Sequence, residues 1–147
     1  MSKLRFGLPL VLAALLVVSS CGYGDKSVKV KMDDVAGEWV ESAGGRIAIS
    51  TDRTFTASGL KSDAFSDNDC PAGAASGTWG FYVYKGESMT EVSEKAQSGT
   101  RLGLSFNGVP QGECLIDLVA VDGGDTLCAS DDPDALCGLD VKFSRKG

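Results

Sequence analysis

The sequence predicts an all-β domain in which about eight antiparallel strands form a meander that closes into a small barrel. Two observations support this fold class. From Gly37 onward, short stretches alternate apolar and polar residues, and clusters of turn residues separate them. Without its first 20 residues the chain of 147 retains 127, a size typical of one domain with a substantial core. A two-sheet sandwich is the alternative arrangement of the same strands.

The alternation places the expected strands near residues 38–41, 46–50, 54–58, 77–84, 101–107, 113–121, 126–130 and 138–145. In each strand, every second residue faces the interior. The residues expected there include Ile47, Ile49, Trp79, Phe81, Val83, Leu102, Leu104, Phe106, Leu139, Val141 and Phe143. Residues 89–97 follow a helical period instead, and residues 27–31 could add a strand at a sheet edge.

The first 20 residues are typical of a secretory signal peptide. Lys3 and Arg5 provide a positive start, an uncharged apolar stretch covers residues 6–18, and two serines follow. A transmembrane helix needs about 20 apolar residues, so this stretch is too short to span a bilayer. Cleavage is therefore expected, and an uncleaved anchor is the alternative.

Residues 18–21, Val-Ser-Ser-Cys, resemble a bacterial lipobox. The resemblance implies that a diacylglycerol is attached to the sulfur of Cys21 and that the signal is cut just before it. Acyl chains such as palmitate anchor a protein stably only when two are present. We therefore expect a lipoprotein on the extracytoplasmic face of the cell membrane. The alternative is a secreted chain in which Cys21 is free or paired.

Cysteine counting agrees with this assignment, because five cysteines leave one unpaired in an oxidising compartment. Four remain when Cys21 is assigned to lipid. If residues 122–125 form a hairpin loop, Cys128 lies opposite Val119 and far from Cys114. A metal site is disfavoured, since the chain has no C-x-x-C spacing and no histidine. The predicted disulfides are Cys128–Cys137 and Cys70–Cys114.

The mature chain would carry 20 acidic and 12 basic residues, a net charge of −8 that argues against a nucleic-acid partner. We expect residues 21–34 to be the lipidated cysteine and a solvated linker, and residues 35–147 to be one barrel domain. About a dozen extended residues span roughly 40 Å, enough to lift a domain off a bilayer. The linker lysines could also contact anionic headgroups.

Gly37-Glu38-Trp39 resembles the Gly-x-Trp motif of lipocalin-type barrels, whose tryptophan packs across one barrel end with an arginine against it. The resemblance implies that Arg145 takes this position. The mature chain is also similar to a family of small actinobacterial lipoproteins that has no established activity. The matching residues are Gly37, Trp39, Ile47, Ile49, Asp52, Thr54, Phe55, residues 77–79 and 132–134, Phe143 and Arg145. Residues 89–97 and the four cysteines depart from the family pattern.

No catalytic site is expected, because the chain lacks histidine and its carboxylates follow no recognisable pattern. Two acidic runs offer oxygens for calcium: one contains Asp63, Asp67, Asn68 and Asp69, the other Asp131, Asp132 and Asp134. Neither has the ligand spacing of an EF-hand, and these residue types are common in turns. We expect turns there, with no metal and no cofactor.

Residues 113–121 are apolar on both faces, so their orientation is ambiguous. If Val119 points inward, Asp117 does too and needs a partner such as Arg101 or a ligand cation. If Ile116 points inward, Asp117 is solvated, and we favour this orientation.

Two functions follow from these residues. The first is a binder of a small apolar or amphipathic ligand in the barrel mouth, with Trp39, Trp79, Arg101 and Asp117 as candidate contacts. The second is a protein-interaction or envelope-associated module with a filled barrel, which uses exposed loops such as residues 59–76. The volume of the barrel interior distinguishes the two.

Overall fold

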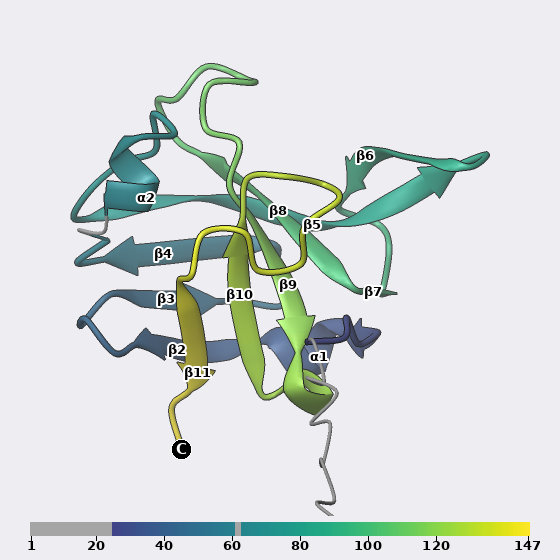
Figure 1. Ribbon diagram of the computed structural model, residues 1–147, viewed down its shortest axis with the longest axis horizontal. Helices are drawn as coiled ribbons and strands as arrows, with labels where there is room; N and C mark the ends of the chain where they lie inside the picture. The colour runs from purple at the N-terminus through teal and green to yellow at the C-terminus, as the bar shows by residue number, and fades with distance from the viewer. Residues whose placement is uncertain (1–24, 61–62) are drawn as a thin grey trace, which may run out of the picture.

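The computed structural model describes residues 25–60 and 63–147, without the side chains of Met89 and Thr90; the expected signal peptide and Cys21 lie outside the described residues. Its main sheet is antiparallel and has nine strands in the order β4-β3-β2-β11-β10-β9-β8-β5-β6 (Figure 1). A further pairing of β4 with β5 closes eight of them into a barrel, and β6 extends the sheet beyond it. The predicted barrel is confirmed, and the sandwich alternative is wrong.

The barrel strands are β2 (Gly37–Glu41), β3 (Arg46–Ile49), β4 (Thr54–Ser58), β5 (Ala75–Lys85), β8 (Arg101–Phe106), β9 (Asp117–Val121), β10 (Thr126–Ser130) and β11 (Lys142–Arg145). The remaining elements are β1 (Val30–Lys31), α1 (Met32–Val35), α2 (Asp63–Ser66), β6 (Ser88–Ser93), β7 (Ser98–Gly99) and the 3-10 turn η1 (Asp122–Gly124). Every barrel strand overlaps its expected range. The last strand is shorter than expected because residues 138–141 belong to a loop in which Asp140 has a positive φ of 53°.

The helical period expected at residues 89–97 is wrong, since most of this stretch forms β6 and a bend. The reason lies in β5, which has 11 residues and extends past the end of β4. Its outer part would leave backbone groups unpaired. The chain turns back at Gly86, whose φ is +71°, and pairs β6 with that outer part. Tertiary pairing therefore overrides the local period.

Side chains fill the barrel interior. Completely buried are Trp39, Trp79, Phe55, Phe65, Phe81, Phe143, Ile47, Leu60, Leu102, Ile116, Leu118 and Leu127. Aromatic rings meet edge to face, for example Phe55 with Phe106 at a centroid distance of 5.0 Å. The expected inward residues are confirmed except for Val83 and Leu139, which are only half-buried because they lie beyond the barrel ends of their strands.

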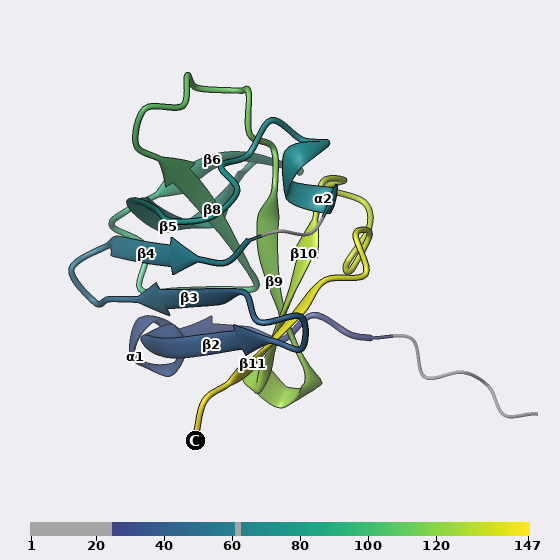
Figure 2. The same ribbon diagram turned by 90° about the vertical axis from the view of Figure 1, so that its left-hand side faces the viewer.

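The two short helices lie at opposite ends of β2, β3 and β4 (Figure 2). At the α1 end, Val35 is buried and its carbonyl accepts a 2.8 Å hydrogen bond from the indole of Trp39. At the α2 end, Leu60 and Phe65 are buried, and Phe65 packs against Phe143. Apolar side chains thus cover both ends of the barrel.

The segment expected to be a solvated linker is packed against the barrel from Val28 onward. The amide of Val28 donates to the carbonyl of Ala120 at 2.8 Å, and β1 pairs with β7. Val30 and Val35 are part of the core. The alternation of apolar and lysine residues in this segment buries the valines, so the folded domain begins before residue 35. Among the described residues, no helix is long and apolar enough to cross a membrane.

Candidate functional site

A hollow of about 910 Å³ lies on the outside of the barrel, across β5, β8 and β9. Its floor consists of residues that alternate with the inward-facing ones: Thr78, Tyr82, Gly103, Ser105 and Asp117. Its walls are β6 with Glu91 and Val92, the adjoining Glu94, the loop at residues 109–115, and the loop at residues 131–133. We call this hollow the outer groove. It owes its shape to β6 and to two loops, not to the barrel interior.

Two glycines let β6 approach the barrel closely. A Cβ atom on Gly103 would lie 2.3 Å from a methyl group of Val92, and one on Gly80 would lie 2.7 Å from the carbonyl oxygen of Ser93. A side chain at Gly80 would displace the backbone of β6, and one at Gly103 would displace the side chain of Val92. The wall formed by Val92 therefore depends on the absence of side chains at Gly80 in β5 and at Gly103 in β8.

The floor of the outer groove contains a hydrogen-bonded cluster. The Tyr82 hydroxyl donates to one oxygen of Asp117 at 2.9 Å, and the Arg101 guanidinium lies 3.5 Å from the other. The side chains of Asp117 and Arg101 are only 17% and 3% exposed. The favoured orientation is confirmed, since Ile116 and Leu118 face the core. The expectation of a solvated Asp117 is wrong, because its carboxylate is largely buried and in contact with Tyr82 and Arg101.

Burial also affects the protonation of this cluster. It raises the pKa of Asp117 above the ordinary value, while the hydrogen bond from Tyr82 and the charge of Arg101 act in the opposite direction. Burial first, and the Asp117 carboxylate second, raise the pKa of Tyr82 well above its usual range. Tyr82 thus remains a hydroxyl donor at neutral pH.

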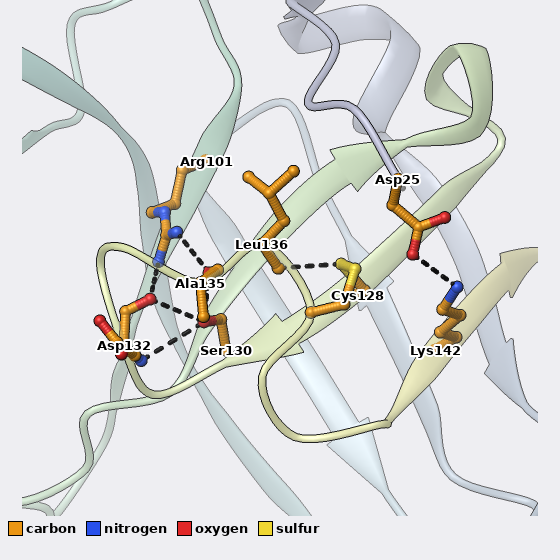
Figure 3. The surroundings of a disulfide bond; sticks show 9 residues. Asp25, Arg101, Cys128, Ser130, Asp132, Ala135, Leu136 and Lys142 are labelled. Atoms are coloured by element: carbon orange, nitrogen blue, oxygen red, sulfur yellow. Dashed lines mark hydrogen bonds and ion pairs between the residues drawn. A yellow bond between two sulfur atoms is a disulfide. The ribbon is translucent and has the colours of Figure 1, made fainter. Parts of the chain in front are cut away.

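Arg101, another candidate ligand contact, holds a loop in place. Its guanidinium donates to the carbonyl oxygens of Asp132, Pro133 and Ala135 at 3.0 to 3.3 Å. The Ser130 hydroxyl bonds the carbonyls of Asp132 and Ala135 from the other side (Figure 3). With these three carbonyls and Asp117, the donors of Arg101 are largely occupied.

Both predicted disulfides are present. Cys128 and Cys137 close the loop that Arg101 holds, and Cys70 is joined to Cys114 across 44 residues of sequence. The register that led to this pairing is also confirmed, because Cys128 pairs with Val119.

The loop also explains the second apolar face of β9. Val119, Val121 and Cys128 point out of the barrel and form a separate buried cluster beneath Leu136 and Cys137. Both faces of β9 are apolar because the residues of one face pack in the barrel core and those of the other pack against this loop.

Trp39 and Trp79, two of the candidate ligand contacts, are core residues. They are 0% and 1% exposed, so the Trp79 indole contributes little to the outer groove at whose edge it lies. Arg145 lies over Trp39, as the resemblance implied, with its guanidinium carbon 4.4 Å from the ring centroid. Arg53 lies over Trp79 at 4.6 Å, a pair that the second Gly-x-Trp could have signalled.

The second acidic run forms a turn, as expected, whereas the first begins with helix α2 and only its residues 67–69 form a turn. Asp132 accepts a hydrogen bond from the amide of Asp134 at 2.8 Å, and the amide of Asp67 donates to the carbonyl of Asp63 at the end of α2. Within the described ranges, no group of three potential ligands is placed to hold a metal ion.

The chemistry of the outer groove is apolar and acidic. Val92 and Leu115 are 38% and 58% exposed on facing walls, and Val109, Pro110 and Pro133 add apolar surface. Four carboxylates line it, from Glu91, Glu94, Asp117 and Asp131, and its described lining contains no basic side chain. Glu91 is paired with Lys85 and Asp117 with Arg101. Glu94 and Asp131 therefore supply most of the negative field.

Sequence reasoning missed Tyr82, Val92, Glu94 and Leu115 as residues of the groove.

Comparisons with protein-family models, with curated proteins and with solved structures each returned no match. The arrangement is suited to holding a positively charged group between apolar surfaces.

Proposed function

We propose that this chain is a lipoprotein, anchored through diacylglyceryl-Cys21 on the extracytoplasmic face of the membrane, whose barrel is a rigid scaffold for a binding groove. The lipobox resemblance supports the anchor. The cysteine pattern supports the compartment, because the four cysteines of the barrel form two disulfides, as proteins of oxidising compartments do. The protein binds and does not catalyse.

The outer groove carries this proposal. A ligand in the barrel mouth would need space beside Trp39 or Trp79, and both side chains are buried beneath covered ends. The outer groove instead exposes apolar side chains next to carboxylates. Such a surface on a small disulfide-linked scaffold is typical of a protein-interaction site.

The occupant that fits best is a basic, partly apolar segment of an envelope protein. Lysine or arginine side chains would lie near Glu94 and Asp131, and aliphatic side chains would contact Val92 and Leu115. A segment in extended form alternates these two kinds of side chain along its length. The net charge of the mature chain, −8, adds long-range attraction for such a partner.

Fluorescence anisotropy with labelled peptides tests this function. The processed protein is titrated into a peptide of alternating lysine and leucine, and into one of alternating glutamate and leucine with the same length. We expect binding of the basic peptide only, weakened by added salt. The double variant Glu94→Lys/Asp131→Lys should bind at least about tenfold more weakly, which corresponds to about 1.4 kcal/mol.

Asp33→Lys/Asp125→Lys provides the matched control, because both aspartates are exposed beside α1 and η1, at the far end of the barrel. It makes the same change of charge without touching the groove. Equal binding of both peptides, or an equal loss in the control variant, would overturn the proposal. Uptake of a fatty acid with a change in tryptophan fluorescence would instead support a ligand inside the barrel.

A further inference from the structure

The N-terminal segment is fastened to the barrel from the first described residue onward, first at β11, then at β9 and finally through β7. Asp25 forms an ion pair with Lys142 of β11 at 2.9 Å (Figure 3). Three residues later, Val28 bonds to β9 through Ala120, and Val30 is 5% exposed. The surface pair contributes little stability alone, but the buried valines hold the segment firmly.

This attachment shortens the tether. Only residues 22–24 separate Cys21 from Asp25, and four residue steps span at most about 14 Å even when fully extended. Measured to Val28, the first core-docked position, the limit is about 25 Å. Both lengths are smaller than the roughly 40 Å available to an undocked linker. A lipidated Cys21 would therefore keep β11 and the segment beside it close to the headgroups.

β5, a central strand of the groove floor, lies opposite β11 in the barrel, whereas Asp117 on β9 lies nearer to β11. In the closed eight-stranded order, three strands separate β11 from β5 in either direction. A tether that ends beside β11 thus places β5, with the groove on its outer face, away from the attachment point. The groove would remain accessible to a partner in the envelope.

The charges agree with this orientation. Residues 25–31 and 142–146, which we call the tether face, contain six basic residues and one acidic residue. The acidic residues nearby are Asp33, Asp34, Asp122, Asp125, Asp140 and Glu38, so this side is close to neutral. Almost the whole net charge of −8 lies elsewhere, including the groove walls. Anionic headgroups would repel that acidic side and accept the lysines of the tether face.

We propose that the tether face lies against phospholipid headgroups, so that the docked segment sets the orientation of the barrel and turns the outer groove away from the bilayer. This inference rests on the proposed lipidation of Cys21. It adds a membrane-facing surface whose occupant is the bilayer, and it assigns Lys26 and Lys29 to headgroup contact, since both are exposed on that face.

Energy transfer in reconstituted vesicles tests the orientation. The lipidated protein carries a fluorescent amino acid either at Ser144 on β11 or at Glu87 in the β5–β6 turn, both exposed. The vesicles contain phosphatidylcholine, phosphatidylglycerol and a headgroup-labelled acceptor. We expect more efficient transfer from position 144 than from position 87. A flexible Gly-Ser spacer of about 20 residues inserted before Asp25, with a mean span of about 25 Å, should abolish the difference.

Charge-reversal variants test the headgroup contact. Lys26→Glu/Lys29→Glu should lower the transfer from position 144, whereas the matched variant Lys85→Glu/Lys95→Glu, at two exposed lysines outside the tether face, should leave it unchanged. Mass spectrometry of the same samples reports acylation of Cys21. An acylated protein with equal transfer from both positions overturns the orientation alone. A protein without acyl chains overturns the proposed anchor and the orientation with it.

Discussion

The guanidinium of Arg145 lies 4.4 Å from the ring centroid of Trp39, and it also donates to the carbonyl of Ala36 at 3.1 Å. The arginine thus joins the last barrel strand to the start of the first. Arg53 and Trp79 repeat the arrangement at 4.6 Å, and the Trp79 indole donates to the carbonyl of Ser50 at 2.9 Å. Both arginine–tryptophan stacks lie at the α1 end, where they close the barrel beneath the N-terminal segment.

Substitutions in the stack of Arg145 on Trp39 should separate the contribution of the buried indole from that of the cation–π contact. Trp39→Ala should lower the free energy of unfolding by about 3 to 5 kcal/mol, because it empties a buried site. Arg145→Ala should lower it by about 0.5 to 1 kcal/mol through loss of the cation–π contact. Urea unfolding of both single variants and the double variant measures their coupling. An effect of Arg145→Ala that is as large without the indole as with it would contradict the stack.

Arg101 should be among the most sensitive positions. Arg101→Ala leaves Asp117 buried without its charge partner, and removal of one member of a buried pair costs about 3 to 5 kcal/mol. The carbonyls of the 131–136 loop also lose their donor, so limited proteolysis should cut that loop first.

Two variants serve as comparisons for Arg101→Ala. Arg101→Lys should rescue it poorly, because an ammonium group cannot reach several carbonyls as a planar guanidinium does. Arg46→Ala removes an exposed ion pair with Glu38 and should cost no more than about 1 kcal/mol. Comparable losses at positions 46 and 101 would contradict the loop-holding role.

The two disulfides should differ in their contributions. Loop-closure entropy gives about 4 kcal/mol for Cys70–Cys114 and about 2.5 to 3 kcal/mol for Cys128–Cys137. Replacement of each pair by serines, followed by calorimetry, checks the order. Loss of the short bridge should additionally expose the cluster around Val119, detected as binding of an apolar dye. A larger destabilisation from the short bridge would show that loop packing outweighs chain entropy.

Glu41 should make stability depend on pH. It is 8% exposed, and burial raises the pKa of its carboxyl. The folded state therefore favours the protonated form, so stability rises as pH falls through the raised pKa towards the unfolded value of about 4.3. Glu41→Gln should be more stable than the natural chain at pH 7, and the difference should vanish below about pH 4. Thermal melts across this range test the sign, and Glu38→Gln is the half-exposed control.

Local patterns were sufficient for much of this fold. Period-two alternation located every barrel strand, because each strand has one face towards a single core. The hairpin at residues 122–125 set the register of β9 and β10 and hence the disulfide pairing. Gly37-Glu38-Trp39 resembles a motif in which an arginine packs against the tryptophan, and this resemblance predicted the contact of Arg145 with Trp39.

The remainder was decided by contacts between residues far apart in the chain. Residues 88–93 form a strand because β5 extends past β4 and pairs with them, and Asp117 is largely buried in contact with Tyr82 of β5 and Arg101 of β8. The outer groove brings together side chains from β5, β6, β8, β9 and two loops, and no spacing in the sequence predicts that these side chains lie together. Alternation tells which way a side chain points from its own strand. What lies beyond that face, whether solvent, a loop or the N-terminal segment, depends on tertiary packing.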